Sequence, residues 1–74
     1  MSLNFADLLS VEQKQALIEG KIQQLAIEGY QLQINRLALE KLENSADALA
    51  AVDTNIQLIV EAITAYQDEL SNLQ

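Results

Sequence analysis

Apolar residues in the second half of the chain recur at alternating steps of three and four residues, without a gap over more than twenty positions. This spacing follows the period of an α-helix, whereas a strand needs a period of two. Repeated as heptads, it is typical of a helix that packs along another helix, as in a coiled coil. It predicts a helix over about residues 46–72, with the stripe Leu49, Val52, Ile56, Ile59, Ile63, Tyr66, Leu70 and Leu73.

The first half predicts a longer helix, over about residues 11–43. Ser10 followed by Gln13 fits a capping box, in which each side chain satisfies a free backbone N–H at the helix start. The chain has no proline, and the next stop signal is the segment "ENSAD". There, Asn44 or Ser45 can end one helix and cap the next. Residues 3–9 predict a short helix or turn whose apolar side chains need a surface to bury them, and the segment could fold back on the early part of the long helix.

Two long helices joined by a short connection pack as antiparallel neighbours. With the bend near residue 45, the pairing places Leu25 opposite Tyr66 and Leu32 opposite Ile59. We therefore predict an all-α fold, an antiparallel helical hairpin that forms one small domain over residues 1–74. On the long helix, the residues at this hairpin seam are Ile18, Ile22, Leu25, Gly29, Leu32, Arg36 and Leu39.

The two glycines stand nine residues apart, which places them on opposite faces of a helix. Gly29 lies on the seam, where a missing side chain leaves room for the Tyr66 ring. Gly20 lies toward the other face, where residues 3–9 or a partner subunit can approach. Each glycine costs about 1 kcal/mol relative to alanine, so close packing is the expected compensation. A helix break at Gly20 is the alternative.

Arg36 is the one charged residue on the seam, and its side chain has two possible roles. It can be a buried device that fixes the register of the two helices. Alternatively, its stem lies along the seam while the guanidinium reaches Asp53 in solvent. We favour the second interpretation, because exposed pairs are the common case.

A second apolar stripe lies opposite the seam, where the partner helix of the hairpin cannot cover it. A helix that is apolar on two faces is expected to be buried on two faces. At 74 residues, without Cys or His, the chain also lacks disulfides and the usual zinc ligands as sources of stability. We therefore predict an obligate homo-oligomer, two hairpins pairing as a homodimeric four-helix bundle. The predicted oligomer or partner interface is Ile27, Tyr30, Ile34 and Leu37.

The residue types give no support to an enzyme. Without His and Cys, the commonest general base and the strongest nucleophile are missing. The paired carboxylates at Glu40/Glu43 and Asp68/Glu69 lie outside the apolar stripes and are expected to be solvated. We predict no catalytic residue, no metal site and no cofactor.

Net charge is −7, and residues 43–74 hold six acids and no base. Such a surface repels phosphate groups, so neither nucleic acid nor an anionic membrane is an expected partner. A basic protein is compatible with it. No basic leader precedes an apolar core at the N-terminus, and a cytoplasmic location is expected.

The sequence therefore indicates a non-enzymatic protein–protein interaction module, an adaptor, assembly factor or small regulatory subunit that associates with itself. One alternative is a subunit of a helical filament or of a secretion or phage-type assembly, because helical hairpins with two apolar faces can polymerise. Another is an acidic mimic of nucleic acid that inhibits a basic protein. That function needs a denser array of acids than this chain carries.

Overall fold

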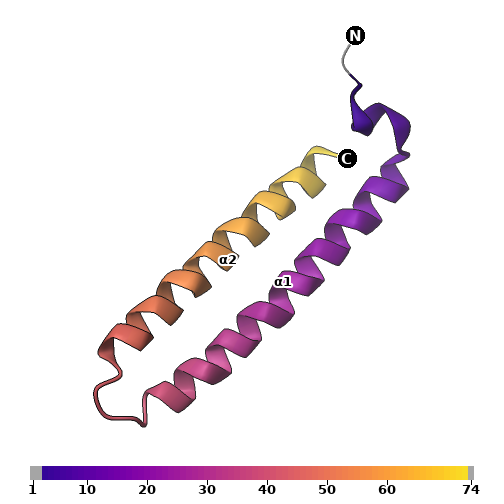
Figure 1. Cartoon of the computed structure of the whole chain (residues 1–74). Coiled ribbons are helices and arrows are strands. Elements are labelled where there is room, and N and C mark those ends of the chain that lie inside the picture. Colours follow the sequence, from indigo (N-terminus) through magenta and orange to yellow (C-terminus); the bar gives the residue numbers. More distant parts are fainter. Residues whose placement is uncertain (1–2, 74) are drawn as a thin grey trace.

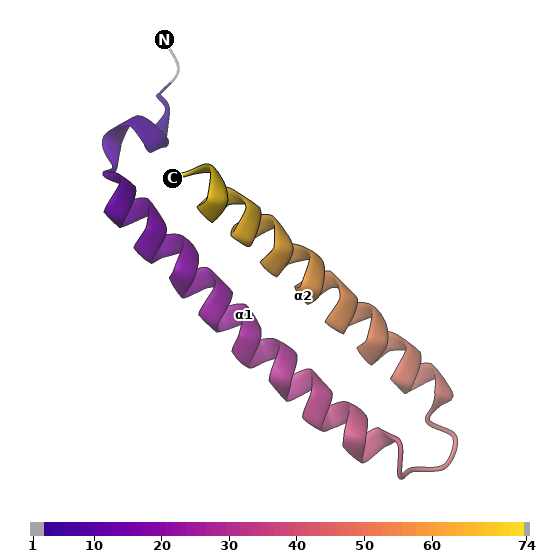
Figure 2. The same cartoon turned by 180° about the vertical axis from the view of Figure 1, so that it is seen from behind.

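The computed structural model describes residues 3–73 and shows two long helices packed side by side. A short 3-10 helix, η1 (Phe5–Leu8), precedes α1 (Val11–Leu39), which a turn connects to α2 (Ala46–Asn72). Figures 1 and 2 show α1 and α2 running antiparallel, with the start of α1 and the end of α2 at the same end of the rod. The principal extents are 56 × 24 × 15 Å. The predicted all-α helical hairpin is thus confirmed, and residues 3–73 contain no strand.

The start of α1 is fixed by the predicted capping box. The Gln13 backbone N–H donates to the Ser10 hydroxyl over 3.1 Å, and the Ser10 N–H donates to the Gln13 side-chain oxygen over 2.9 Å. From there α1 continues through both glycines to Leu39. The alternative of a helix break at Gly20 is therefore wrong.

The end of α1 lies four residues earlier than predicted, at Leu39 instead of residue 43. Beyond it, the Lys41 N–H donates to the Ala38 carbonyl over 3.2 Å and the Leu42 N–H to the Leu39 carbonyl over 3.1 Å, so the chain tightens into turns. Asn44 then takes a left-handed conformation with φ of 60°. Asparagine adopts this conformation more readily than other residues with a Cβ, which explains its position at the reversal.

Ser45 caps the end of α1 rather than the start of α2. Its hydroxyl donates to the Leu39 carbonyl over 2.8 Å and to the Leu42 carbonyl over 3.0 Å. Carbonyls at the end of a helix lack the partner one turn further along, and the Leu39 carbonyl accepts from Ser45 in addition to the Leu42 N–H. The Ser45 side chain makes no capping hydrogen bond to α2, although Ser45 is the residue before its first turn. The hydroxyl thereby ties the two helices together at the turn.

The hairpin seam lies along the line of contact between α1 and α2, and the predicted seam residues are half-buried there. Among residues 3–73 no side chain is fully buried, because two helices alone cover only one face of each other. The half-buried seam comprises Ile18, Ile22, Leu25, Gly29, Leu32, Arg36 and Leu39 on α1 and Leu49, Val52, Ile56, Ile59, Ile63, Tyr66, Leu70 and Leu73 on α2.

One contact across the seam, that of Gly29, differs from the prediction. A Cβ placed on Gly29 would lie 3.5 Å from Cγ2 of Ile59, and this is the contact that Gly29 makes with α2. The sequence predicts Ile63 and the Tyr66 ring at this position instead.

The segment before α1 does not fold back on it. The Asn4 side chain accepts a hydrogen bond from the Ala6 N–H and starts η1, but Leu3, Phe5 and Leu8 are 66%, 71% and 61% exposed. A Cβ placed on Gly20 would meet nothing within 4 Å. Of the two neighbours considered for Gly20, residues 3–9 of the same chain do not approach it, and the segment extends from the end of the rod (Figure 1).

Candidate interaction surface

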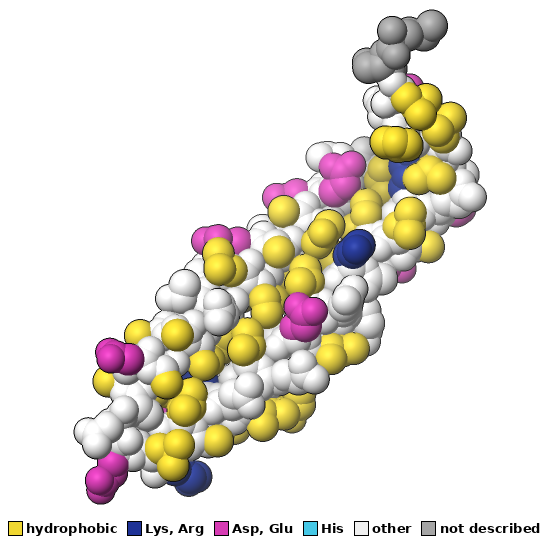
Figure 3. All heavy atoms as spheres, viewed as in Figure 1, with side chains coloured by type: hydrophobic (Ala, Val, Ile, Leu, Met, Phe, Trp, Pro, Cys, Tyr) yellow, Lys and Arg dark blue, Asp and Glu magenta, His cyan; other side chains and the backbone are white. Residues whose placement is uncertain are grey.

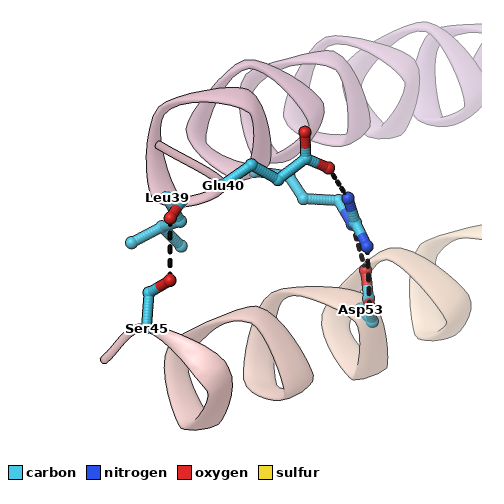
Figure 4. A network of polar contacts seen from close by, with 5 residues as sticks. Leu39, Glu40, Ser45 and Asp53 are labelled. Carbon is cyan, nitrogen blue, oxygen red and sulfur yellow. Dashed lines mark hydrogen bonds and ion pairs between the residues drawn. The ribbon is translucent and has the colours of Figure 1, made fainter. Parts of the chain in front are cut away.

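A polar cluster around Arg36 links the helices near the turn (Figure 4). The Arg36 Nε donates to Asp53 Oδ1 over 2.6 Å, and its Nη2 lies 3.4 Å from Asp53 Oδ2. Its Nη1 also pairs with Glu40, one turn further along α1. The side chains of Arg36, Asp53 and Glu40 are 38%, 52% and 44% exposed. Arg36 therefore makes a solvated ion pair with Asp53 and is not a buried device.

The ion pair has a defined electrostatic effect on both partners. The hydrogen bond from Arg36 holds the pKa of the Asp53 carboxyl below its ordinary value, with the positive charge adding to the effect. The hydrogen bond to Asp53 correspondingly raises the pKa of Arg36. Both shifts arise from pairing at the surface, so the cluster is a structural tie between α1 and α2. No group of three or more acids among residues 3–73 is arranged to hold a metal ion.

The predicted interface residues form an exposed apolar face on α1, away from α2. Ile27, Tyr30, Ile34 and Leu37 are 53%, 64%, 47% and 62% exposed. They recur at steps of three and four residues, which places them on one face of the helix. We refer to these four residues as the α1 patch. Exposed large apolar residues that gather in this way mark interaction surfaces in soluble proteins.

The α1 patch is continuous with a groove beside the seam. Tyr30 lines this groove together with Ala26 and Gly29 of α1, and Val60 and Ile63 of α2 line it from the opposite side. Val60 is itself 49% exposed. The sequence prediction missed Val60, because it falls outside the steps of three and four. The sequence does place Val60 directly after Ile59. This position widens the apolar face of α2 toward the groove that contains Tyr30 and could have indicated the role of Val60.

The groove on the other side of the seam has more polar residues in its lining, although Leu32, Leu58 and Ile59 also line it. Glu28, Gln31 and Asn35 of α1 line it opposite Asn55 and Leu58 of α2. Amide and carboxylate side chains here are already solvated and gain little from burial against an apolar surface. The two sides of the hairpin therefore differ in residue types, and the side with fewer polar residues in its lining is the one that contains Tyr30.

The space-filling view shows how the charges and apolar groups divide over one face. Apolar side chains run along the line between the helices and gather around η1, whereas acidic side chains follow the outer edge of α2 (Figure 3). The acids within the span of α2 are Asp47, Asp53, Glu61, Asp68 and Glu69.

The size of the exposed surface is large for a chain of this mass. The accessible area is 5874 Å², whereas a compact folded protein of 8.2 kDa exposes about 4,500 Å². The radius of gyration is 17.0 Å, whereas a compact domain of this length has about 11 Å. The single hairpin thus leaves roughly 1,300 Å² more surface in water than a compact protein would.

By length and composition alone, α2 is a helix that could cross a membrane. Its large apolar residues are mainly those that line the seam, and Asp53 and Glu61 lie within its central part. A carboxylate near the middle of a spanning helix costs about 2.5–3.5 kcal/mol on insertion scales. This composition is also found in core helices of proteins that do not enter membranes, and the absence of a membrane partner stays a prediction.

Comparison with known proteins adds no relative. No protein-family model, no curated protein and no solved structure matches the chain.

Proposed function

We propose that the chain is a non-enzymatic protein–protein interaction module that works as an obligate homo-oligomer, in the role of an adaptor, assembly factor or small regulatory subunit. The simplest assembly is a dimer of hairpins in a four-helix bundle, with the long helices at its centre. The observation that carries the proposal is the α1 patch, four large apolar side chains that the hairpin leaves at least 47% exposed.

The energetic case rests on burial. Two packed helices without a fully buried side chain among residues 3–73 gain little of the hydrophobic stabilisation that small domains need. Obligate homodimers bury upwards of about 1,000 Å² on each partner. The surplus of exposed area in this hairpin has the same order, so one such interface would bring the chain to the surface area of a compact protein.

The test compares two exposed apolar positions. Truncating Tyr30 to alanine removes an aromatic anchor from the α1 patch, whereas Leu58→Ala changes a similarly exposed side chain on the polar side of the hairpin. We expect Tyr30→Ala to weaken self-association at least tenfold, since buried aromatic anchors typically contribute more than about 2 kcal/mol. Leu58→Ala should leave it unchanged. Sedimentation velocity over a concentration series measures both, and equal affinities would contradict the proposal.

A filament subunit is a second candidate, and η1 is the observation that favours it. The exposed side chains of Leu3, Phe5 and Leu8 form an apolar cluster separate from the α1 patch in the sequence. Two different apolar surfaces allow a head-to-tail contact between copies. An assembly built from such contacts forms an open filament when the rotation from one copy to the next does not close a ring. Removing residues 1–9 distinguishes the two assemblies. A closed dimer keeps its mass, whereas a filament loses its concentration-dependent growth.

A further inference from the structure

The apolar and polar residues divide unevenly along the outer face of α1. The α1 patch occupies residues 27–37, in the half of the helix near the turn. In the other half, the same face carries Glu12, Ala16, Glu19 and Gln23. The patch therefore covers about 15 Å of a helix nearly three times as long.

This uneven division restricts how two copies can meet. In a two-fold symmetric dimer, the same surface of each copy contacts the other. All four apolar side chains are buried against apolar neighbours only when the patches lie directly over each other. The two-fold axis then passes through the middle of the patch, between Tyr30 and Ile34.

We propose, on the basis of the self-association above, that two copies of α1 dock antiparallel across this point. Tyr30 then packs against the partner's Ile34, and Ile27 packs against the partner's Leu37. The groove lined by Val60 and Ile63 lies beside this contact, because Tyr30 lines it too. Each α2 therefore contributes apolar side chains at the edge of the contact between the two copies of α1.

Charge favours the antiparallel orientation over the parallel one. A parallel pair places Glu12 and Glu19 beside their own copies, and also brings the acid-rich ends of both α2 helices to the same height. Like charges at such distances repel. In the antiparallel pair, the acidic first part of α1 projects past the partner's turn and stays in water. Lys41 meanwhile comes beside the partner's Gln23 and near the partner's Glu19.

The amount of buried surface also fits this arrangement. The two copies of α1 overlap from about residue 25 to Leu39, and this stretch includes every residue of the α1 patch. The surplus exposed area of roughly 1,300 Å² per chain exceeds the ~800 Å² that each partner contributes to a standard stable interface. The second copy is therefore large enough, and apolar enough at the right place, to be the occupant of this face.

The test uses the absence of cysteine in the chain. Gln23→Cys on α1 and Lys41→Cys in the turn that follows α1 are exposed positions on either side of the α1 patch, so neither change touches the seam. In the antiparallel pair, residue 23 faces the partner's residue 41, whereas two copies of residue 23 are about 27 Å apart. A disulfide needs Cα atoms within about 7 Å. An equimolar mixture should therefore cross-link as the mixed dimer, and neither variant alone should cross-link.

The other outcomes separate this inference from the proposed function. Cross-linking of each variant with itself means a parallel pair and overturns the inference. A dimeric mass under reducing conditions, without any cross-link in the mixture, places the interface elsewhere and overturns the inference while the proposed function stands. A monomeric mass of both variants and of the unmodified chain overturns both. Asp68→Cys, on the outer face of α2, serves as the control that should cross-link with neither.

Discussion

At the scale of single residues, the turn carries most of the specific polar contacts between the two helices. Ser45 satisfies two carbonyls at the end of α1, and Arg36 joins Asp53 across the seam. The sequence allowed the Arg36–Asp53 pair to be predicted, because both residues fall near the bend on facing helices. It did not allow the role of Ser45 to be predicted, since a serine in this position caps the following helix as readily as the preceding one.

The Arg36–Asp53 pair predicts a pH dependence with a definite sign. Because pairing holds the pKa of Asp53 below its ordinary value, the contribution to stability is present at pH 7 and is lost as the pH falls through the folded-state pKa, below about pH 4. Asp53→Asn should therefore lower the melting temperature slightly at pH 7, and the difference from the unmodified chain should close by about pH 2. Thermal melts followed by circular dichroism at fixed protein concentration measure it.

Asp68→Asn is the matched control for this measurement, because Asp68 makes no ion pair among residues 3–73. Its difference from the unmodified chain should show no comparable change between these two pH values. A difference for Asp53→Asn that persists at pH 2 would mean that the variant acts through the helix itself rather than through the ion pair.

At the scale of elements, the two helices and their seam could be predicted because periodicity alone determines which residues share a face. Steps of three and four residues placed all the seam residues correctly on their helices. The end of α1 could not be predicted to better than about one turn, and the residue that lies against Gly29 could not be predicted either. That end is set by the left-handed Asn44 and by the Ser45 hydrogen bonds, and several residues of "ENSAD" could have made either contact.

The surroundings of the two glycines in α1 predict opposite responses to the same substitution. A leucine at Gly29 would place its side chain against Ile59, where even a Cβ comes to 3.5 Å. Overpacking of this kind costs about 1–3 kcal/mol, and we expect Gly29→Leu to lower the free energy of unfolding accordingly. Gly20 has nothing within 4 Å of a Cβ. There, leucine should be neutral or should stabilise by up to about 1 kcal/mol through its better helix propensity.

Urea unfolding of both leucine variants at one protein concentration measures the two changes. Gly20→Ala is a further control, since alanine adds helix propensity with the smallest side chain. Destabilisation by Gly20→Leu but not by Gly20→Ala would show that another surface, from the N-terminal segment or from a second copy, approaches α1 at Gly20.

At the scale of the whole molecule, the hairpin is a rod in which only part of the apolar surface is covered by the packing of α1 against α2. The seam occupies one face of each helix, while the α1 patch and the groove beside it stay exposed to solvent. The apolar residues on two faces of α1 are readable from the sequence, and they are the basis of the predicted interface. In the proposed symmetric dimer the covering surface is the α1 patch of a second copy, so a single hairpin shows the surface but not the way in which two copies meet.

The molar mass of the unmodified chain in solution tests this account most directly. Sedimentation equilibrium between about 1 and 100 µM should give twice the mass of one 8.2 kDa chain, without further growth at the upper concentrations. In an obligate dimer folding and association are coupled, so the folded species is expected to have the mass of two chains. A stable helical species with the mass of one chain throughout the range would contradict the central claim that the α1 patch is covered by a second copy.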